Sequence, residues 1–170
     1  NGKSFRKHIQ LAQLMQLEGR GAAREASLPC FPNNEEELFK ILRIFERLAN
    51  ALHAAHVGGV IHRDIKPANL VLDSLATPVI LDFGLARVAS EETSTLTMTG
   101  EVFGTPAYMP PELLRGQVDQ PVPSLDVYSL AVTLYECLTL KRPFEGGTPE
   151  AVYHQILNED PVSVREHHPG

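Results

Sequence analysis

The stretch "IHRDIKPANLVLDSLATPVILDFG", residues 61–84, places acidic and amide side chains at fixed spacing around two short apolar runs. Asp64, Asn69 and Asp82 offer oxygen atoms, and Lys66 adds a cation two residues after the first of them. Mg²⁺ prefers oxygen ligands, and an ammonium group attracts phosphate as a point charge. The pattern is therefore typical of a site that handles phosphate together with a divalent cation.

The composition of the 170-residue chain is that of a folded domain, with 43% hydrophobic and 21% charged residues. A net charge of −6, without a basic stripe, argues against nucleic-acid binding. Cys30 and Cys137 lie far apart without a metal-binding spacing, which predicts free thiols in a reducing compartment. No apolar run is long enough to span a membrane and no signal peptide is evident. We expect a cytoplasmic domain, with any membrane anchor outside these residues.

A long amphipathic helix is predicted from Asn34 onward, because apolar side chains recur at steps of three and four through residue 55. Asn34 is the expected N-cap, Glu37 is expected to reach back to it, and Gly58 ends the helix. His53 and His56 lie three apart on this helix, but no third metal ligand accompanies them.

Short apolar runs at residues 60–62, 70–72 and 79–81 predict strands, and residues 73–78 predict a turn between the last two. Residues 85–123 are rich in Ser, Thr, Gly and Pro, and a loop of that length is usually functional. Two more helices are predicted, a buried one from Ser124 and another from Thr148, with Pro149 at its first position. Residues 1–33 leave two interpretations open, a helix over 9–17 or a hinge at 14–19.

Three motifs in order give the chain a family resemblance. Residues 62–69, "HRDIKPAN", match the catalytic-loop pattern H-R-D-x-x-x-x-N, residues 82–84 match D-F-G, and "GTPAYMPPE" at 104–112 resembles the end of an activation loop. Together they resemble the eukaryotic-type, or Hanks-type, protein kinases, and especially the bacterial Ser/Thr members. The resemblance covers about residues 35–158.

The resemblance implies roles for the residues that match the motifs. Asp64 would accept the proton of the acceptor hydroxyl, and Lys66 would meet the γ-phosphate of ATP. Asn69 and Asp82 would bind Mg²⁺, and Val71 would pack under the adenine ring. The implied cofactors are therefore ATP and Mg²⁺, and the implied reaction is phosphate transfer.

The same resemblance favours a protein Ser/Thr hydroxyl as the acceptor. Lys66 follows the Ser/Thr pattern, as does Thr105, which in the family touches the catalytic Asp and Lys. Arg63 is a ready partner for a phosphate on the activation loop, where Thr97 and Thr99 are the expected phosphorylation sites. The alternative is that this threonine-rich loop is simply polar. Self-association for autophosphorylation would accompany the first interpretation.

Five further residues would be structural. The ring of His62 would pack beside Phe83, which precedes Gly84 of the D-F-G motif. Asp126 would accept hydrogen bonds from the backbone of the catalytic loop. The family's A-P-E appears here as Pro110-Pro111-Glu112, with proline at the alanine position, and the usual arginine partner of Glu112 would lie beyond residue 170.

The expected architecture is α+β, the helical C-terminal lobe of a kinase with a short β-hairpin. Residues 34–170 would form this lobe, truncated before its last helices, and residues 1–33 would be a remnant of the N-lobe or hinge. The run "GRGAAR" at 19–24 does not match the glycine-rich phosphate loop, so these residues alone are expected to be inactive. The alternatives are a pseudokinase that serves as a binding module, a small-molecule phosphotransferase of the same superfamily, or an unrelated interaction domain.

Overall fold

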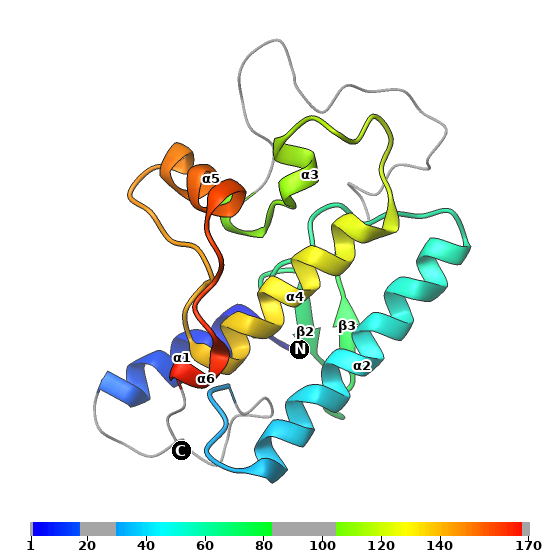
Figure 1. Ribbon diagram of the computed structural model, residues 1–170. Coiled ribbons are helices and arrows are strands. Elements are labelled where there is room, and N and C mark those ends of the chain that lie inside the picture. The colour runs from blue at the N-terminus through cyan, green and yellow to red at the C-terminus, as the bar shows by residue number, and fades with distance from the viewer. Residues whose placement is uncertain (1, 18–29, 83–104, 168–170) are drawn as a thin grey trace.

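Helices α2 (Glu35–Val57) and α4 (Pro123–Thr139) lie against each other and form the centre of the molecule (Figure 1). The computed structural model describes residues 2–17, 30–82 and 105–167. The main core draws on both helices, with Ile41 and Leu48 from α2 and Leu130 from α4 among its buried members. The two predicted helices are confirmed, although α4 begins one residue early because Pro123 suits a first helical turn.

The start of α2 shows how its sequence determines its boundary. The side-chain oxygen of Asn34 accepts a hydrogen bond from the backbone N–H of Glu37 at 2.9 Å, which confirms the predicted N-cap. The Glu37 carboxylate reaches one residue further back than predicted, because it accepts from the backbone N–H of Asn33 at 2.9 Å. At the other end, Gly58 donates to the carbonyl of Ala54 and closes the last turn.

Three short strands form one antiparallel sheet in the order β1 (Lys3–Ser4), β2 (Leu70–Leu72) and β3 (Pro78–Ile80). The predicted hairpin of β2 and β3 is confirmed, and its turn is held by Asp73, whose Oδ1 accepts from two backbone N–H groups. The predicted strand at 60–62 is wrong, since only Val60 makes a bridge. β1 was not predicted, because a two-residue strand has no detectable alternation.

Helix α1 (Phe5–Leu17) follows β1 and packs into the same core as α2. Phe5 is fully buried and meets Phe45 of α2 edge to face, with ring centroids 5.9 Å apart. The helical interpretation of residues 9–17 is therefore confirmed. A hinge over 14–17 is wrong, because these residues continue the helix; residues 18 and 19 lie outside the described ranges.

The remaining elements pack against α4 or against one another (Figure 1). They are the short helix η2 (Pro106–Tyr108), α3 (Pro111–Leu114), α5 (Pro149–Asn158) and α6 (Val164–His167). The predicted loop 85–123 is thus partly helical in its described portion. A second small core joins Ala107 to Phe144, Val152 and Ile156. The N-cap of α5 is Thr148, as predicted. Within the described ranges, no helix is long and apolar enough to cross a membrane.

Candidate functional site

Asp126, in the first turn of α4, anchors the loop that carries the predicted site. Its side chain is completely buried. Oδ1 accepts a hydrogen bond from the backbone N–H of Arg63 at 2.7 Å, and Oδ2 accepts from the backbone N–H of His62 at 2.8 Å. Arg63 has a φ of 68°, a left-handed conformation that costs an L-residue about 1–2 kcal/mol. The two hydrogen bonds offset that cost and fix the backbone just before Asp64.

His56 of α2 is a further partner of Asp126 that the sequence analysis missed. Its Nε2 lies 2.8 Å from Oδ2 of Asp126. His53, three residues earlier on the same helix, is exposed, so the two histidines do not face a common site. The part of the chain that the structure describes contains no cluster of three metal-ligating side chains. The four-residue step from buried Leu52 was the available signal, because it puts His56 on the core face of the helix.

The imidazole of His62 ties the loop to the end of β3. The Nδ1 atom of the ring accepts a hydrogen bond from the backbone N–H of Asp64 at 3.3 Å. The ring proton is therefore on Nε2, and Nε2 donates it to the carbonyl oxygen of Leu81 at 2.8 Å. The backbone N–H of Leu81 in turn donates to the carbonyl of Asn69 at 2.8 Å. These bonds bring Asp82, the next residue, beside Asn69.

Asp64, Lys66 and Asn69 form one hydrogen-bonded cluster. Lys66 Nζ lies 2.8 Å from Oδ2 of Asp64. The amide nitrogen of Asn69 donates to the same Oδ2 at 2.9 Å and to the backbone carbonyl of Asp64 at 2.8 Å. Both side-chain contacts use Oδ2, so Oδ1 of Asp64 remains able to accept a proton. About a fifth of each side chain is exposed, 19% for Asp64 and 24% for Lys66, so a ligand can reach both.

The donor set beside this cluster fits Mg²⁺. Because the nitrogen of Asn69 makes both of its hydrogen bonds, its Oδ1 has no partner in the described part of the chain. The carboxylate of Asp82 is exposed, and its backbone has a φ of 60°. An amide oxygen and a carboxylate are ligands that Mg²⁺ uses when it bridges a protein and a phosphate.

Val71 lies on the open face of the small sheet next to these ligands. It is half-buried and pairs directly with Val79, which is 39% exposed. Directly opposed residues of an antiparallel pair share a face, so the two valines form an apolar surface. Leu70, Leu72 and Ile80 point the other way, into the core. The sheet can therefore offer a flat apolar group a surface close to the polar cluster.

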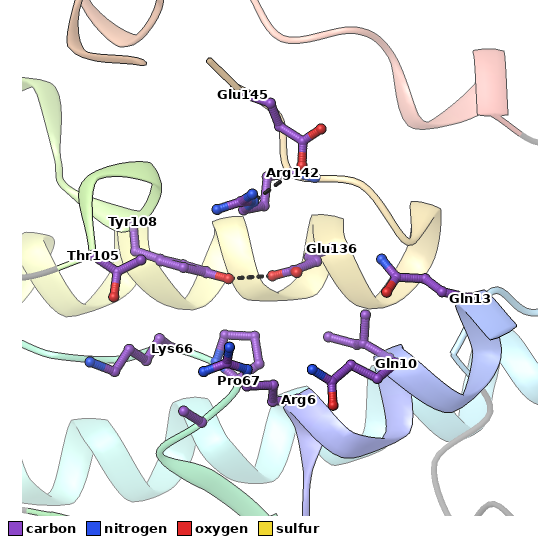
Figure 2. A pocket seen from close by; sticks show the side chains of 12 residues that line it. Arg6, Gln10, Gln13, Lys66, Pro67, Thr105, Tyr108, Glu136, Arg142 and Glu145 are labelled. Atoms are coloured by element: carbon purple, nitrogen blue, oxygen red, sulfur yellow. Dashed lines mark hydrogen bonds and ion pairs between the residues drawn. The ribbon is translucent and has the colours of Figure 1, made fainter. Parts of the chain in front are cut away.

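A cavity of about 350 Å³ opens on the other side of Lys66 (Figure 2). Side chains from five regions line it: Lys66 and Pro67 from the loop, Arg6, Gln10 and Gln13 from α1, Thr105 and Tyr108 near η2, Glu136 from α4, and Arg142 and Glu145 after it. Thr105 shares this cavity with Lys66, but in the described ranges it makes no hydrogen bond to Lys66 or Asp64. The contact that the resemblance implied is therefore not a hydrogen bond here.

Glu136 and Tyr108 form a half-buried pair in this cavity, and neither was predicted as a site residue. The Tyr108 hydroxyl donates to the Glu136 carboxylate (Figure 2). Burial raises the pKa of Glu136, although the hydrogen bond from Tyr108 acts in the opposite direction and lowers it. Burial, followed by the charge of Glu136, raises the pKa of Tyr108 well above its usual range. An acidic residue within an otherwise apolar α4 was the signal in the sequence.

The structure brings together most of the residues that the motifs singled out. Six of them belong to one hydrogen-bonded network: Asp64, Lys66, Asn69, His62, Arg63 and Asp126. Asp82 directly follows Leu81, which bonds to both His62 and Asn69. Glu112 lies apart from it, where its carboxylate accepts from the Ser124 hydroxyl at 3.3 Å. Four predicted residues lie outside the described ranges: Phe83, Gly84, Thr97 and Thr99.

Comparison with known proteins gives a consistent set of matches. The family model described as "Protein kinase domain" matches residues 21–168. Serine/threonine-protein kinase PknB of Mycobacterium tuberculosis is 37% identical over 131 residues, which cover 77% of this chain and 21% of that protein. PknB of Mycobacterium leprae is 40% identical over 129 residues, covering 76% and 20%. A probable PknB of Corynebacterium glutamicum is 42% identical over 115 residues, covering 68% and 18%. The chain thus spans about a fifth of the length of these relatives.

Proposed function

Because this chain belongs to the protein kinase domain family, we propose that its protein transfers the γ-phosphate of ATP to a Ser or Thr hydroxyl of a protein substrate. The network that joins Asp64 to Lys66, Asn69 and the buried Asp126 is the observation that carries this proposal. The serine/threonine kinase names of the relatives support the acceptor class.

Asp64 orients the acceptor hydroxyl and accepts its proton at Oδ1, the oxygen that makes no hydrogen bond to the described chain. Oδ2 is held by Lys66 and Asn69, so the carboxylate keeps one orientation. Lys66 moves its ammonium toward the γ-phosphate as ATP binds, which neutralises charge that builds up during transfer. Positioning of the reactants and charge neutralisation then supply most of the catalysis.

Asn69 Oδ1 and the Asp82 carboxylate would hold Mg²⁺, which when bound neutralises the ATP phosphates and orients them. The backbone bond between Leu81 and Asn69 keeps these two ligands adjacent. The apolar face at Val71 receives the adenine ring. The protein kinase family uses ATP and Mg²⁺ in general, and the oxygen donors on this chain support the same cofactors here.

The acceptor segment of the substrate enters through the cavity that Lys66 and Thr105 line (Figure 2). Most of the side chains that line this cavity are polar, and they can pair with the backbone groups of an extended peptide. A small-molecule phosphotransferase has no need for the segment 104–112, so that alternative is less favoured. Use of ATP also assigns this domain to the cytoplasm.

Phosphorylation of Thr97 or Thr99 within a self-associated pair would activate the enzyme, with Arg63 as partner of the phosphate. Residues 1–170 by themselves should have little activity, since no G-x-G-x-x-G motif with a following strand lysine occurs within them.

The test is phosphate transfer from labelled ATP to a generic Ser/Thr protein by the full-length product, comparing Asp64→Asn with Asp73→Asn. Asp73 is the matched control, because its carboxylate holds an exposed hairpin turn away from the cluster. Loss of at least about 10²-fold in kcat for Asp64→Asn alone supports the mechanism. Equal activity of the two variants contradicts it, and an inactive wild-type protein that binds ATP favours the pseudokinase.

A further inference from the structure

The two cysteines, distant in sequence, lie together in the main core. Cys30 precedes α2 and Cys137 is in the last turns of α4; they are 4% and 0% exposed. The backbone N–H of Phe31 donates to the carbonyl of Cys137 at 2.8 Å, which holds the two segments side by side. Cys30 and Cys137 belong to the same core cluster, both thiols are free, and the neighbouring Cys30 contributes to the raised pKa of Cys137. The prediction of free thiols is confirmed, although the sequence did not show that the two residues lie on neighbouring segments.

We propose that Cys30 and Cys137 are a redox modification site, at which hydrogen peroxide converts the two thiols into a reversible intramolecular disulfide. Two thiols on segments that a backbone hydrogen bond already joins need little movement to form the bond. A disulfide outcompetes further oxidation of either sulfur when a resolving thiol is adjacent.

The order of the two steps follows from the surroundings of each sulfur. Cys137 is completely enclosed, and burial followed by the neighbouring Cys30 raises the pKa of its thiol, so Cys137 is a poor first nucleophile. Cys30 is nearer the surface, and the adjacent Phe31 lines a cavity of about 140 Å³, which is large enough to admit a molecule the size of peroxide. Cys30 is therefore oxidised first.

In the first step, the sulfur of Cys30 attacks one peroxide oxygen; the O–O bond breaks, and a sulfenic acid and one water form. In the second step, the sulfur of Cys137 attacks the sulfur of Cys30; the S–S bond forms, the S–O bond breaks, and a second water leaves. Two thiols are thereby oxidised by two electrons in total, and one peroxide is reduced to two waters. A small thiol reductant reverses the change.

The disulfide would tie the segment before α2 to the end of α4 (Figure 1). These helices carry His56 and Asp126 toward their other ends, where the two side chains bond to each other. The cross-link and the His56–Asp126 contact would then hold the helix pair at both ends. Because the bond closes a loop of about a hundred residues, the thermal midpoint should rise by on the order of 5 °C or more.

The experiment treats the full-length protein with hydrogen peroxide, blocks remaining thiols with an alkylating reagent, and maps the peptides under non-reducing conditions. We expect one linked pair of peptides, Cys30 with Cys137, lighter by two hydrogen atoms and separated by dithiothreitol, together with the rise in thermal midpoint. Cys30→Ser should abolish that rise. The proposal is overturned if, in the treated wild-type protein, both cysteines are alkylated, carry sulfinic acid, or are linked to another chain. This measurement uses the wild-type protein, so it does not depend on the folding of any variant.

Discussion

Replacing Asp126 with asparagine removes the charge that holds the catalytic loop in place. The carboxylate accepts from the backbone N–H groups of His62 and Arg63 and bonds to His56, at 2.7–2.8 Å. Asparagine keeps one oxygen, so an NH₂ group must face the donors at the other position. A hydrogen bond to a charged group is worth about 1.5–3 kcal/mol, and a buried donor left without a partner costs about 1–3 kcal/mol. We therefore expect Asp126→Asn to lower the free energy of unfolding by about 3 kcal/mol.

The effect on activity should follow from the backbone. When one of the two acceptor oxygens is lost, the hydrogen bonds no longer offset the energetic cost of the left-handed conformation of Arg63. The backbone then relaxes, and Asp64 shifts relative to its substrate. A misplacement of about 1 Å costs on the order of 10²-fold in rate. Urea denaturation followed by circular dichroism measures stability, and kcat measures the rate. Asp73→Asn is the matched control, because asparagine preserves the single oxygen, Oδ1, that Asp73 uses. A loss below about 1 kcal/mol, or equal losses in the two variants, refutes the reasoning.

Asn69→Ala should weaken the apparent affinity for Mg²⁺ by about 10-fold or more, measured by titrating Mg²⁺ in kinetic assays; an unchanged dependence contradicts the assignment. Burial, and after it the charge of Lys3, lowers the pKa of His8. The contribution of neutral His8 to the free energy of unfolding is therefore fully present above about pH 6.5 and decreases as the pH drops below that value. His8→Leu should reduce the decrease in thermal midpoint at low pH, whereas the control His53→Leu, at an exposed position, should leave it unchanged. The explanation is excluded if the thermal midpoint of both variants depends on pH in the same way. Burial raises the pKa of Glu136. Its contribution to the free energy of unfolding is therefore fully present below pH 4.5 and is lost as the pH rises through the raised pKa. Glu136→Gln still accepts from a hydroxyl and should remove that fall; a variant with the wild-type pH profile would contradict it.

The elements with a strong local signal were predicted well. α2 has a capping residue, a regular apolar face and terminal glycines, and each of these acts within a few residues along the chain. The β2–β3 hairpin and the start of α5 at Thr148 were predictable for the same reason. β1 and the bridge at Val60 depend on partners elsewhere, so the sequence predicted neither correctly.

The candidate site likewise contains residues that the local sequence identified and residues that it did not. The motif residues Asp64, Lys66 and Asn69 lie within six positions, and their mutual contacts follow from one short loop. The spatial partners His56 and Glu136 lie outside the three motifs, and Tyr108 lies within the segment 104–112 without its contact to Glu136 being predictable from it. They became identifiable only when α2, η2 and α4 were seen packed together.

The amino-acid sequence by itself determined which chemical groups are present, in what local order, and on which helix or strand most of them lie, because capping, periodicity and turn formation act over a few residues. Only the tertiary structure decided what each group faces. It gave Asp126 its backbone donors across more than sixty residues, and it brought Cys30 against Cys137 across more than a hundred. Such contacts depend on the packing of α2 against α4, and packing is a property of the whole core.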